Sequence, residues 1–222
     1  MRLAGLIFDM GDILFDATAW RRWLAGELGR RGLAVTYEQL VGRWEAALVD
    51  VYRGQVKYWD RLAEMLASFG LGESAAAELV RAAREKGHQV RAERKLFDGV
   101  AATLEALKKA GVKLAVLSDS ESGQDQLREL LAKLGIEHCF DAVVTSVDIA
   151  AVKPEPRAFQ AAADALGLEL SQCAFVGHDI DELSGAQAAG LYAIAYNYPL
   201  GAPADRYVEH FEQLLEVVAG SR

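Results

Sequence analysis

The sequence predicts an α/β fold with a doubly wound, mainly parallel sheet of five strands and a separate all-helical region. Three observations lead to this prediction. Short runs of Val, Ile, Leu and Phe lack the polar–apolar alternation of a half-exposed strand. Helical patterns lie between the later runs, as expected where parallel strands are joined by right-handed crossovers. A long segment near the N-terminus contains helical patterns and no convincing strand.

The predicted strands are short and continuously apolar, which suits strands buried on both faces of a sheet. They are expected at residues 3–8, 113–117, 142–145, 173–177 and 192–196. The helices between the later strands are expected at residues 99–110, 121–134, 155–166 and 182–189.

The ends of these helices carry the expected residues. Glycine tolerates the left-handed conformation that often ends a helix, and it follows the predicted helices at Gly111, Gly135, Gly167 and Gly190. Proline is permitted in a first helical turn, and Pro154 and Pro156 lie where a helix should begin.

Residues 16–95 interrupt the alternation of strands and helices. Helices are expected at residues 16–31, 36–53, 55–69 and 73–94, with breaks near Gly32, Gly54 and Gly70. The tryptophans of the chain all lie here, at Trp20, Trp23, Trp44 and Trp59. We interpret them as the core of a small helical bundle inserted after the first strand.

Composition narrows the class of protein. The chain has 222 residues, enough for one good-sized core with a smaller cap. Its net charge of −8 argues weakly against nucleic-acid binding, although an acidic surface also simply favours solubility. Cys139 and Cys173 have no metal-ligand spacing, so buried free thiols in a reducing compartment are expected. The first apolar run is too short for a secretory segment or a membrane span, so we expect a cytoplasmic protein.

Polar residues follow four of the predicted strands. Asp9 follows the first strand, Ser118 the second, Lys153 lies beyond the third, and the loop 177–182 follows the fourth. The carboxyl ends of parallel strands lie along one edge of the sheet, where open α/β sheets bind ligands. We therefore expect these groups to converge.

Asp9 and Ser118 each allow a chemical and a structural interpretation. Asp9 is a candidate covalent nucleophile, or else a turn residue after a strand. The Ser118 hydroxyl is a candidate ligand for a phosphoryl oxygen near a helix start, or else a helix N-cap. The two interpretations of Ser118 are compatible.

Lys153 and the acidic loop 177–182 are also open to two interpretations. Lys153 would neutralise charge on a transferring group if it lay among acids; otherwise it is a solvated surface lysine. The loop holds Asp179, Asp181 and Glu182, which are candidate oxygen ligands for Mg²⁺. Acids at a helix N-terminus are, however, favoured by the helix dipole without any metal. His178 is a candidate pocket imidazole or a structural hydrogen-bonding group.

Taken together, these segments resemble the motifs of the haloacid dehalogenase superfamily of hydrolases. The resemblance covers nearly the whole chain, and the helical insertion after the first motif matches the subgroup with an α-helical cap. The matching segments are Phe8–Leu14, Leu117–Asp119, Lys153–Pro156, Phe175–Glu182 with Gly185–Gly190, and Phe97–Val100 at the return from cap to core.

The resemblance implies a Rossmann-like core (residues 1–15 and 96–222) and a helical cap (residues 16–95). The strands of the first and fourth motifs would be neighbours at the topological switch point. Asp9 would be the nucleophile, Ser118 would bind the transferring group, and Lys153 would orient and neutralise it. Gly11, Asp12 and Asp119 would also lie at the phosphate site. Mg²⁺ would be bound by Asp9, the Gly11 carbonyl and an acid of the fourth motif, Asp179 or Glu182.

Two positions depart from the family pattern. Gly11 stands where family phosphatases carry a second Asp, which protonates the leaving group; loss of such an acid typically costs about 10²–10⁴ in rate. Asp12 is one residue further along. His178 stands where the fourth motif usually has an Asp, and nitrogen is a poor ligand for Mg²⁺. Asp179 could replace it, with Glu182 or Asp181 in support.

The leading hypothesis is a Mg²⁺-dependent phosphatase for a small phosphorylated metabolite, a monomer or homodimer without nucleic-acid or membrane partners. The second is a metal-independent 2-haloacid dehalogenase acting through an aspartyl ester at Asp9. Its halide would be bound by a cap residue: Trp20, Arg21, Arg22 or Arg53. The third is a catalytically degenerate binding protein, motivated by Gly11 and His178.

Overall fold

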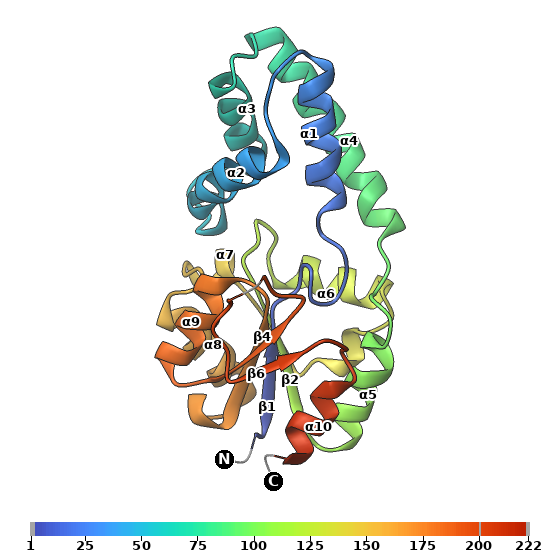
Figure 1. Cartoon of the computed structure of the whole chain (residues 1–222), viewed down its shortest axis with the longest axis vertical. Coiled ribbons are helices and arrows are strands. Elements are labelled where there is room, and N and C mark those ends of the chain that lie inside the picture. Colours follow the sequence, from blue (N-terminus) through green and yellow to red (C-terminus); the bar gives the residue numbers. More distant parts are fainter. Residues whose placement is uncertain (1–2, 200, 221–222) are drawn as a thin grey trace.

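The computed structural model describes residues 3–199 and 201–220 of the chain, and these contain a parallel sheet of six strands (Figure 1). The strands are β1 (Gly5–Phe8), β2 (Lys113–Ser118), β3 (Ala142–Thr145), β4 (Cys173–Gly177), β5 (Tyr192–Tyr196) and β6 (Arg206–Val208). Their order is β3-β2-β1-β4-β5-β6, and every neighbouring pair is parallel. The order reverses between β1 and β4, which are therefore neighbours at the switch point. This confirms the Rossmann-like doubly wound core.

The prediction of five strands was wrong, because β6 was missed. This edge strand has three residues, and both Arg206 and Tyr207 are exposed while Val208 is buried. Such a segment is too short and too polar to form the apolar run by which the other strands were recognised. The remaining strands lie where the sequence predicts them, except that β1 begins at Gly5.

Each face of the sheet is covered by helices and has its own apolar core. Leu6 and Phe8 of β1 pack with helices α5 (Val100–Lys109), α6 (Gln124–Lys133) and α10 (Gln213–Gly220). Ile7 points to the opposite face and packs with α8 (Pro156–Leu166) and α9 (Ile180–Ala189). Burial on both faces explains why β1 is apolar without alternation. Shorter helical turns are α7 (Ser146–Ile149), η1 (Glu137–Cys139) and η2 (Leu170–Gln172).

Helices α1 (Ala19–Arg30), α2 (Tyr37–Tyr52), α3 (Tyr58–Ser68) and α4 (Glu73–Glu93) form a layer over the carboxyl end of the sheet (Figure 1). We call it the helical layer. It has its own apolar core, in which Trp44 is buried and the other three tryptophans are partly buried. The tryptophans therefore do pack a helical bundle, as predicted. The four helices begin and end within a few residues of their expected positions, and Thr36 and Gln39 form a capping box at the start of α2.

The chain enters and leaves the helical layer through two segments that lie side by side. Phe15 and Leu96 form an antiparallel bridge, and the Phe97 N–H donates to the Leu14 carbonyl at 2.9 Å. Further along the layer, Arg53 of the segment after α2 forms an ion pair with Glu155 before α8. The layer is thus tied to the sheet at two separate places.

Pro154, which follows Lys153, packs very closely on Gly185 of α9. A side-chain carbon at Gly185 would lie 2.4 Å from Pro154 Cβ and 2.9 Å from the Pro154 carbonyl oxygen. Only a residue without a side chain fits there. The contact therefore sets the distance between α9 and the backbone that carries Lys153.

None of the helices in the described residues is long and apolar enough to cross a membrane.

Substitution of Phe159 tests whether the apolar core between α8 and the sheet is assigned correctly. It is 0% exposed, and its ring packs edge-on against Phe175 at 5.2 Å between centroids. We expect Phe159→Ala to lower the free energy of unfolding by about 3–5 kcal/mol, since truncation leaves a cavity. Urea unfolding followed by circular dichroism measures this. Val49→Ala, at a position on α2 that is 37% exposed, should change stability by less than about 0.5 kcal/mol. Equal effects of the two substitutions would contradict the assigned core.

Candidate active site

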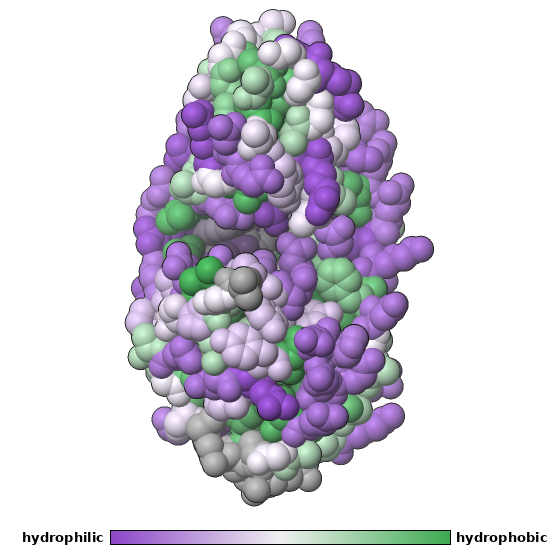
Figure 2. Space-filling model, in the orientation of Figure 1, coloured by the Kyte–Doolittle hydropathy of each residue, from purple (hydrophilic) through white to green (hydrophobic). Residues whose placement is uncertain are grey.

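A cleft of about 580 Å³ lies between the carboxyl end of the sheet and the helical layer. A hollow at this level opens on the face shown in Figure 2, whose surface is otherwise mainly hydrophilic. Every site residue predicted from the sequence lines this one cleft: Asp9, Gly11, Asp12, Ser118, Asp119, Lys153, Asp179 and Glu182. The convergence expected from the strand ends is therefore present.

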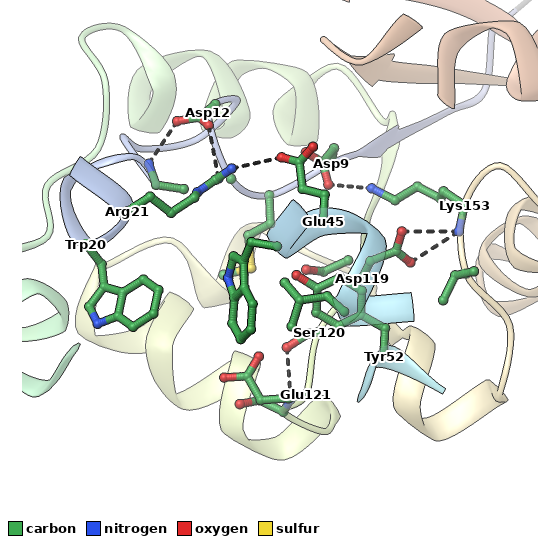
Figure 3. Close-up of a pocket in the computed structure, with 18 of the residues that line it drawn as sticks. Asp9, Asp12, Trp20, Arg21, Glu45, Tyr52, Asp119, Ser120, Glu121 and Lys153 are labelled. Atoms are coloured by element: carbon green, nitrogen blue, oxygen red, sulfur yellow. Dashed lines mark hydrogen bonds and ion pairs between the residues drawn. The ribbon is translucent and has the colours of Figure 1, made fainter. Parts of the chain in front are cut away.

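Asp9 and Lys153 lie in direct contact on the floor of the cleft (Figure 3). The Asp9 N–H donates to the Val176 carbonyl at 3.0 Å, which continues the pairing of β1 with β4 and fixes the residue. Lys153 Nζ donates to Asp9 Oδ1 at 2.5 Å and to Glu182 Oε2 at 3.1 Å. The Lys153 side chain is 1% exposed. A buried ammonium group thus bridges two carboxylates from different segments.

The carboxylates keep Lys153 charged. Burial disfavours the ammonium form, but Asp9, Glu182 and Asp119 outweigh this effect and hold the pKa of Lys153 above its ordinary value. Burial also raises the pKa of Glu182, in opposition to the nearby Lys153 ammonium. At neutral pH the Lys153 side chain is therefore an ammonium group.

Asp119 holds the backbone that carries Lys153. Both oxygens of its carboxylate accept from the Lys153 N–H at 3.2 Å, and burial raises its pKa. The adjacent Ser120 N–H donates to Ser146 Oγ at 3.0 Å, which ties the β2 loop to α7. Ser118 is buried at the end of β2, beside the strand that carries Asp9. Helix α6 begins at Gln124, three residues later than predicted, because residues 119–123 form this loop.

Asp12 is held by contacts within its own loop and with the helical layer. Its Oδ1 accepts from the Ala17 N–H at 2.8 Å, and its Oδ2 lies 3.7 Å from Arg21 Nη2. Its backbone has φ of 57°, in the left-handed region, and its carbonyl accepts from Asn197 Nδ2. Gly11 lines the cleft, where a side-chain carbon would come within 3.1 Å of Ala17 Cβ.

The acids of the loop after β4 are also engaged. Asp179 Oδ1 accepts from the N–H groups of Asp181 and Glu182, so this side chain caps α9. His178 Nε2 lies 3.7 Å from Asp9 Oδ2. The histidine, and not Asp179, is therefore the residue of this loop whose contact with Asp9 is seen.

The groups around Asp9 do not fit a magnesium ion. Mg²⁺ needs oxygen ligands in near-octahedral geometry, whereas the two Asp9 oxygens face Lys153 Nζ and His178 Nε2. Across residues 3–199 and 201–220, no three His, Cys, Asp or Glu side chains are grouped so that they could hold a metal ion. The magnesium site implied by the resemblance stays a prediction without a matching ligand arrangement.

The helical layer supplies an aromatic and charged wall of the cleft, of which only Trp20 and Arg21 were candidate site residues from the sequence. Trp20, Trp44, Tyr58 and Trp59 contact one another with ring centroids 4.8–6.4 Å apart. Arg21 lies between Asp12 and Glu45, donating to Glu45 at 3.0 Å (Figure 3). Burial raises the pKa of Tyr52, and Glu121 raises it further, so Tyr52 stays a neutral hydroxyl. Further lining residues are Arg91 and Arg94.

A partial signal for this wall exists in the sequence. Trp44, Leu48 and Tyr52 recur every four residues and so share one face of α2. The spacing does not say whether that face meets other helices or a cleft. Of the residues considered for binding a halide, Trp20 and Arg21 line the cleft. Arg22 instead stacks over Tyr37, and Arg53 pairs with Glu155.

Comparison with known proteins places these features in a family. Residues 3–190 match the model of the haloacid dehalogenase-like hydrolases. A phosphatase of Mycobacterium tuberculosis is 30% identical over 200 residues, covering 87% of each chain. A phosphoglycolate phosphatase of Yersinia pestis is 27% identical over 97% of this chain and 93% of its own.

Solved structures show the same fold. A 2-haloacid dehalogenase from Pseudomonas syringae superposes with a TM-score of 0.68 at 24% identity, covering 99% of this chain and 100% of its own. A second crystal structure, of a dehalogenase, gives a TM-score of 0.72 at 24% identity, covering 98% and 97%. Sheet order, cleft and family match agree, and the chain belongs to the haloacid dehalogenase-like hydrolases.

Proposed function

We propose that the chain is a phosphatase of small phosphorylated metabolites that transfers the phosphoryl group to Asp9. The observation that carries the proposal is the contact of Asp9 with the buried Lys153 ammonium group at the floor of a cleft. The names of several relatives support the phosphatase activity, among them a glyceraldehyde 3-phosphate phosphatase of Methanothermobacter thermautotrophicus that is 29% identical over 93% of this chain.

In this proposal the two Asp9 oxygens have different tasks. Oδ1 is hydrogen-bonded to Lys153, so Oδ2 is the attacking atom. A bond forms between Oδ2 and phosphorus while the bond from phosphorus to the ester oxygen breaks. The leaving alkoxide takes a proton from water, since Gly11 offers no acid. Water then hydrolyses the aspartyl-phosphate and releases phosphate.

Lys153 and Ser118 bind the transferring group in this scheme. The ammonium group compensates the charge that develops on the phosphoryl oxygens, and it is already oriented by Asp9, Glu182 and the backbone contact with Asp119. Ser118, at the end of β2, donates its hydroxyl to a phosphoryl oxygen. Gly11, Asp12 and Asp119 shape the surrounding loops.

We expect residues 16–95 to act as a cap over a core of residues 1–15 and 96–222. Of that core, residues 1–2, 200 and 221–222 lie outside the described residues. The cap covers the cleft and excludes water, as lids do in other enzymes. The predicted cytoplasmic location stays a prediction; Cys139 and Cys173 are both free and buried, which is compatible with it.

Asp9→Asn should reduce hydrolysis to the uncatalysed rate, because an amide does not form the covalent intermediate. The measurement is phosphate release from p-nitrophenyl phosphate, phosphoglycolate and glyceraldehyde 3-phosphate. Asp125→Asn, at an exposed position of α6 that does not line the cleft, serves as the control and should retain activity. Undiminished turnover by Asp9→Asn would rule out the proposed nucleophile.

Lys153→Met should both stop turnover and destabilise the fold. Removing the ammonium leaves the carboxyl groups of Asp9 and Glu182, whose side chains are 12% and 17% exposed, without their partner, which costs about 3–5 kcal/mol. Adding Glu182→Gln should recover part of this loss, since one charge is then absent. The control Lys109→Met, at a side chain that is 81% exposed, should leave the melting temperature unchanged. A Lys153→Met protein as stable as the wild type would contradict the buried bridge.

Two observations favour a metal-independent dehalogenase as a second candidate. Gly11 supplies no acid, and attack on a carbon bearing a halogen needs none. The aromatic wall with Arg21 also offers an apolar surface beside a cation that could take a halide.

Chloride release from 2-chloropropionate separates the two candidates. A phosphatase releases phosphate from the ester panel and no chloride, whereas a dehalogenase gives the opposite result. Failure of the folded protein to release either product would point to the third possibility, a binding protein without catalysis.

A further inference from the structure

We propose that the hydrolysis at Asp9 proceeds without a divalent metal ion, because Lys153 supplies the only cation that this arrangement of acids can hold. The inference rests on the proposed function for its activity test, but its binding test does not. It departs from the Mg²⁺ dependence that the resemblance implies.

The carboxylates that would have to bind a metal are already committed to other partners. Asp9 Oδ1 and Glu182 Oε2 converge on one ammonium nitrogen, at 2.5 and 3.1 Å. The point between these two acids, where a cation bound by both would lie, is therefore taken by Lys153 Nζ. A dication placed beside it would meet a buried like charge, and the 1% exposure of Lys153 leaves the side chain no route to move aside into water.

The loop after β4 offers no replacement. His178 places a nitrogen 3.7 Å from Asp9 Oδ2, and nitrogen suits Mg²⁺ poorly. Asp179 is the next acid along the chain, and its Oδ1 already accepts hydrogen bonds from two N–H groups at the start of α9. Turning it toward Asp9 would break this cap and leave two amides at the helix start without acceptors.

The loop after β1 does not compensate either. Asp12 binds the Ala17 N–H with one oxygen and faces Arg21 with the other. Gly11 has no side chain to offer. Glu182, Asp179 and Asp12 are thus held by an ammonium, a helix start, a loop amide and a guanidinium group, and a metal site built from these three acids would have to break those contacts.

Mn²⁺ binding followed by electron paramagnetic resonance tests the proposal without any substrate. The wild type should leave the signal of free Mn²⁺ unchanged. His178→Asp, which places a carboxylate beside Asp9, separates two causes of the exclusion: Mn²⁺ binding by this variant would assign the exclusion in the wild type to the imidazole at position 178. His178→Asn is the matched control without the added charge. Saturable binding of one Mn²⁺ by the wild type that is lost in Asp9→Asn would overturn the proposal. A His178→Asp protein that binds no Mn²⁺ would contradict a role of His178 in the exclusion and leave Lys153 as the group that excludes the ion.

Activity gives the second readout. Hydrolysis by the wild type should be the same after dialysis against EDTA as in added Mg²⁺, whereas His178→Asp should become stimulated by Mg²⁺. A wild-type rate that collapses in EDTA and returns with Mg²⁺ would refute the proposal. If no substrate is hydrolysed at all, the proposed function fails, and the Mn²⁺ measurement still decides whether a metal binds.

Discussion

The bridge from Lys153 to Asp9 and Glu182 is the contact on which the arrangement of the cleft depends. It joins the end of β1, the segment before α8 and the first turn of α9, which are far apart in the sequence. Buried charges are costly unless each has its partner. The three segments therefore have to meet in this one geometry, and the switch point between β1 and β4 gives them the place to do so.

Most of the fold follows from local signals in the sequence. The apolar runs of β1 to β5 and the positions of the main helices were predictable because burial on both faces removes alternation, and because Gly167 and Gly190 end their helices in the left-handed conformation. The edge strand β6 and the C-terminal helix α10 were not predicted. Arg206 and Tyr207 are exposed and only Val208 is buried, so the pairing of β6 depends on β5 and not on its own composition.

Part of the site was also predictable, because the ends of the strands place the residues that follow them. Residues that follow the strands directly, such as Asp9 and Ser118, are placed by the sheet, and their meeting could be inferred from strand direction alone. What each acid contacts could not be inferred. Asp119 and Asp179 were both candidates for ligand binding, yet one holds a backbone N–H and the other caps a helix. The wall of the helical layer depends on the docking of distant helices, which no local pattern encodes.

The close approach of Gly185 to Pro154 carries a consequence for how this molecule tolerates change. The absence of a side chain at Gly185 sets the distance between α9 and the segment that carries Lys153. Any larger residue would push this segment away from α9 and move the Lys153 ammonium group away from its carboxylates, although Gly185 itself does not line the cleft. In a library of random variants, loss of activity there would mimic a defect in chemistry while its origin lay in spacing alone.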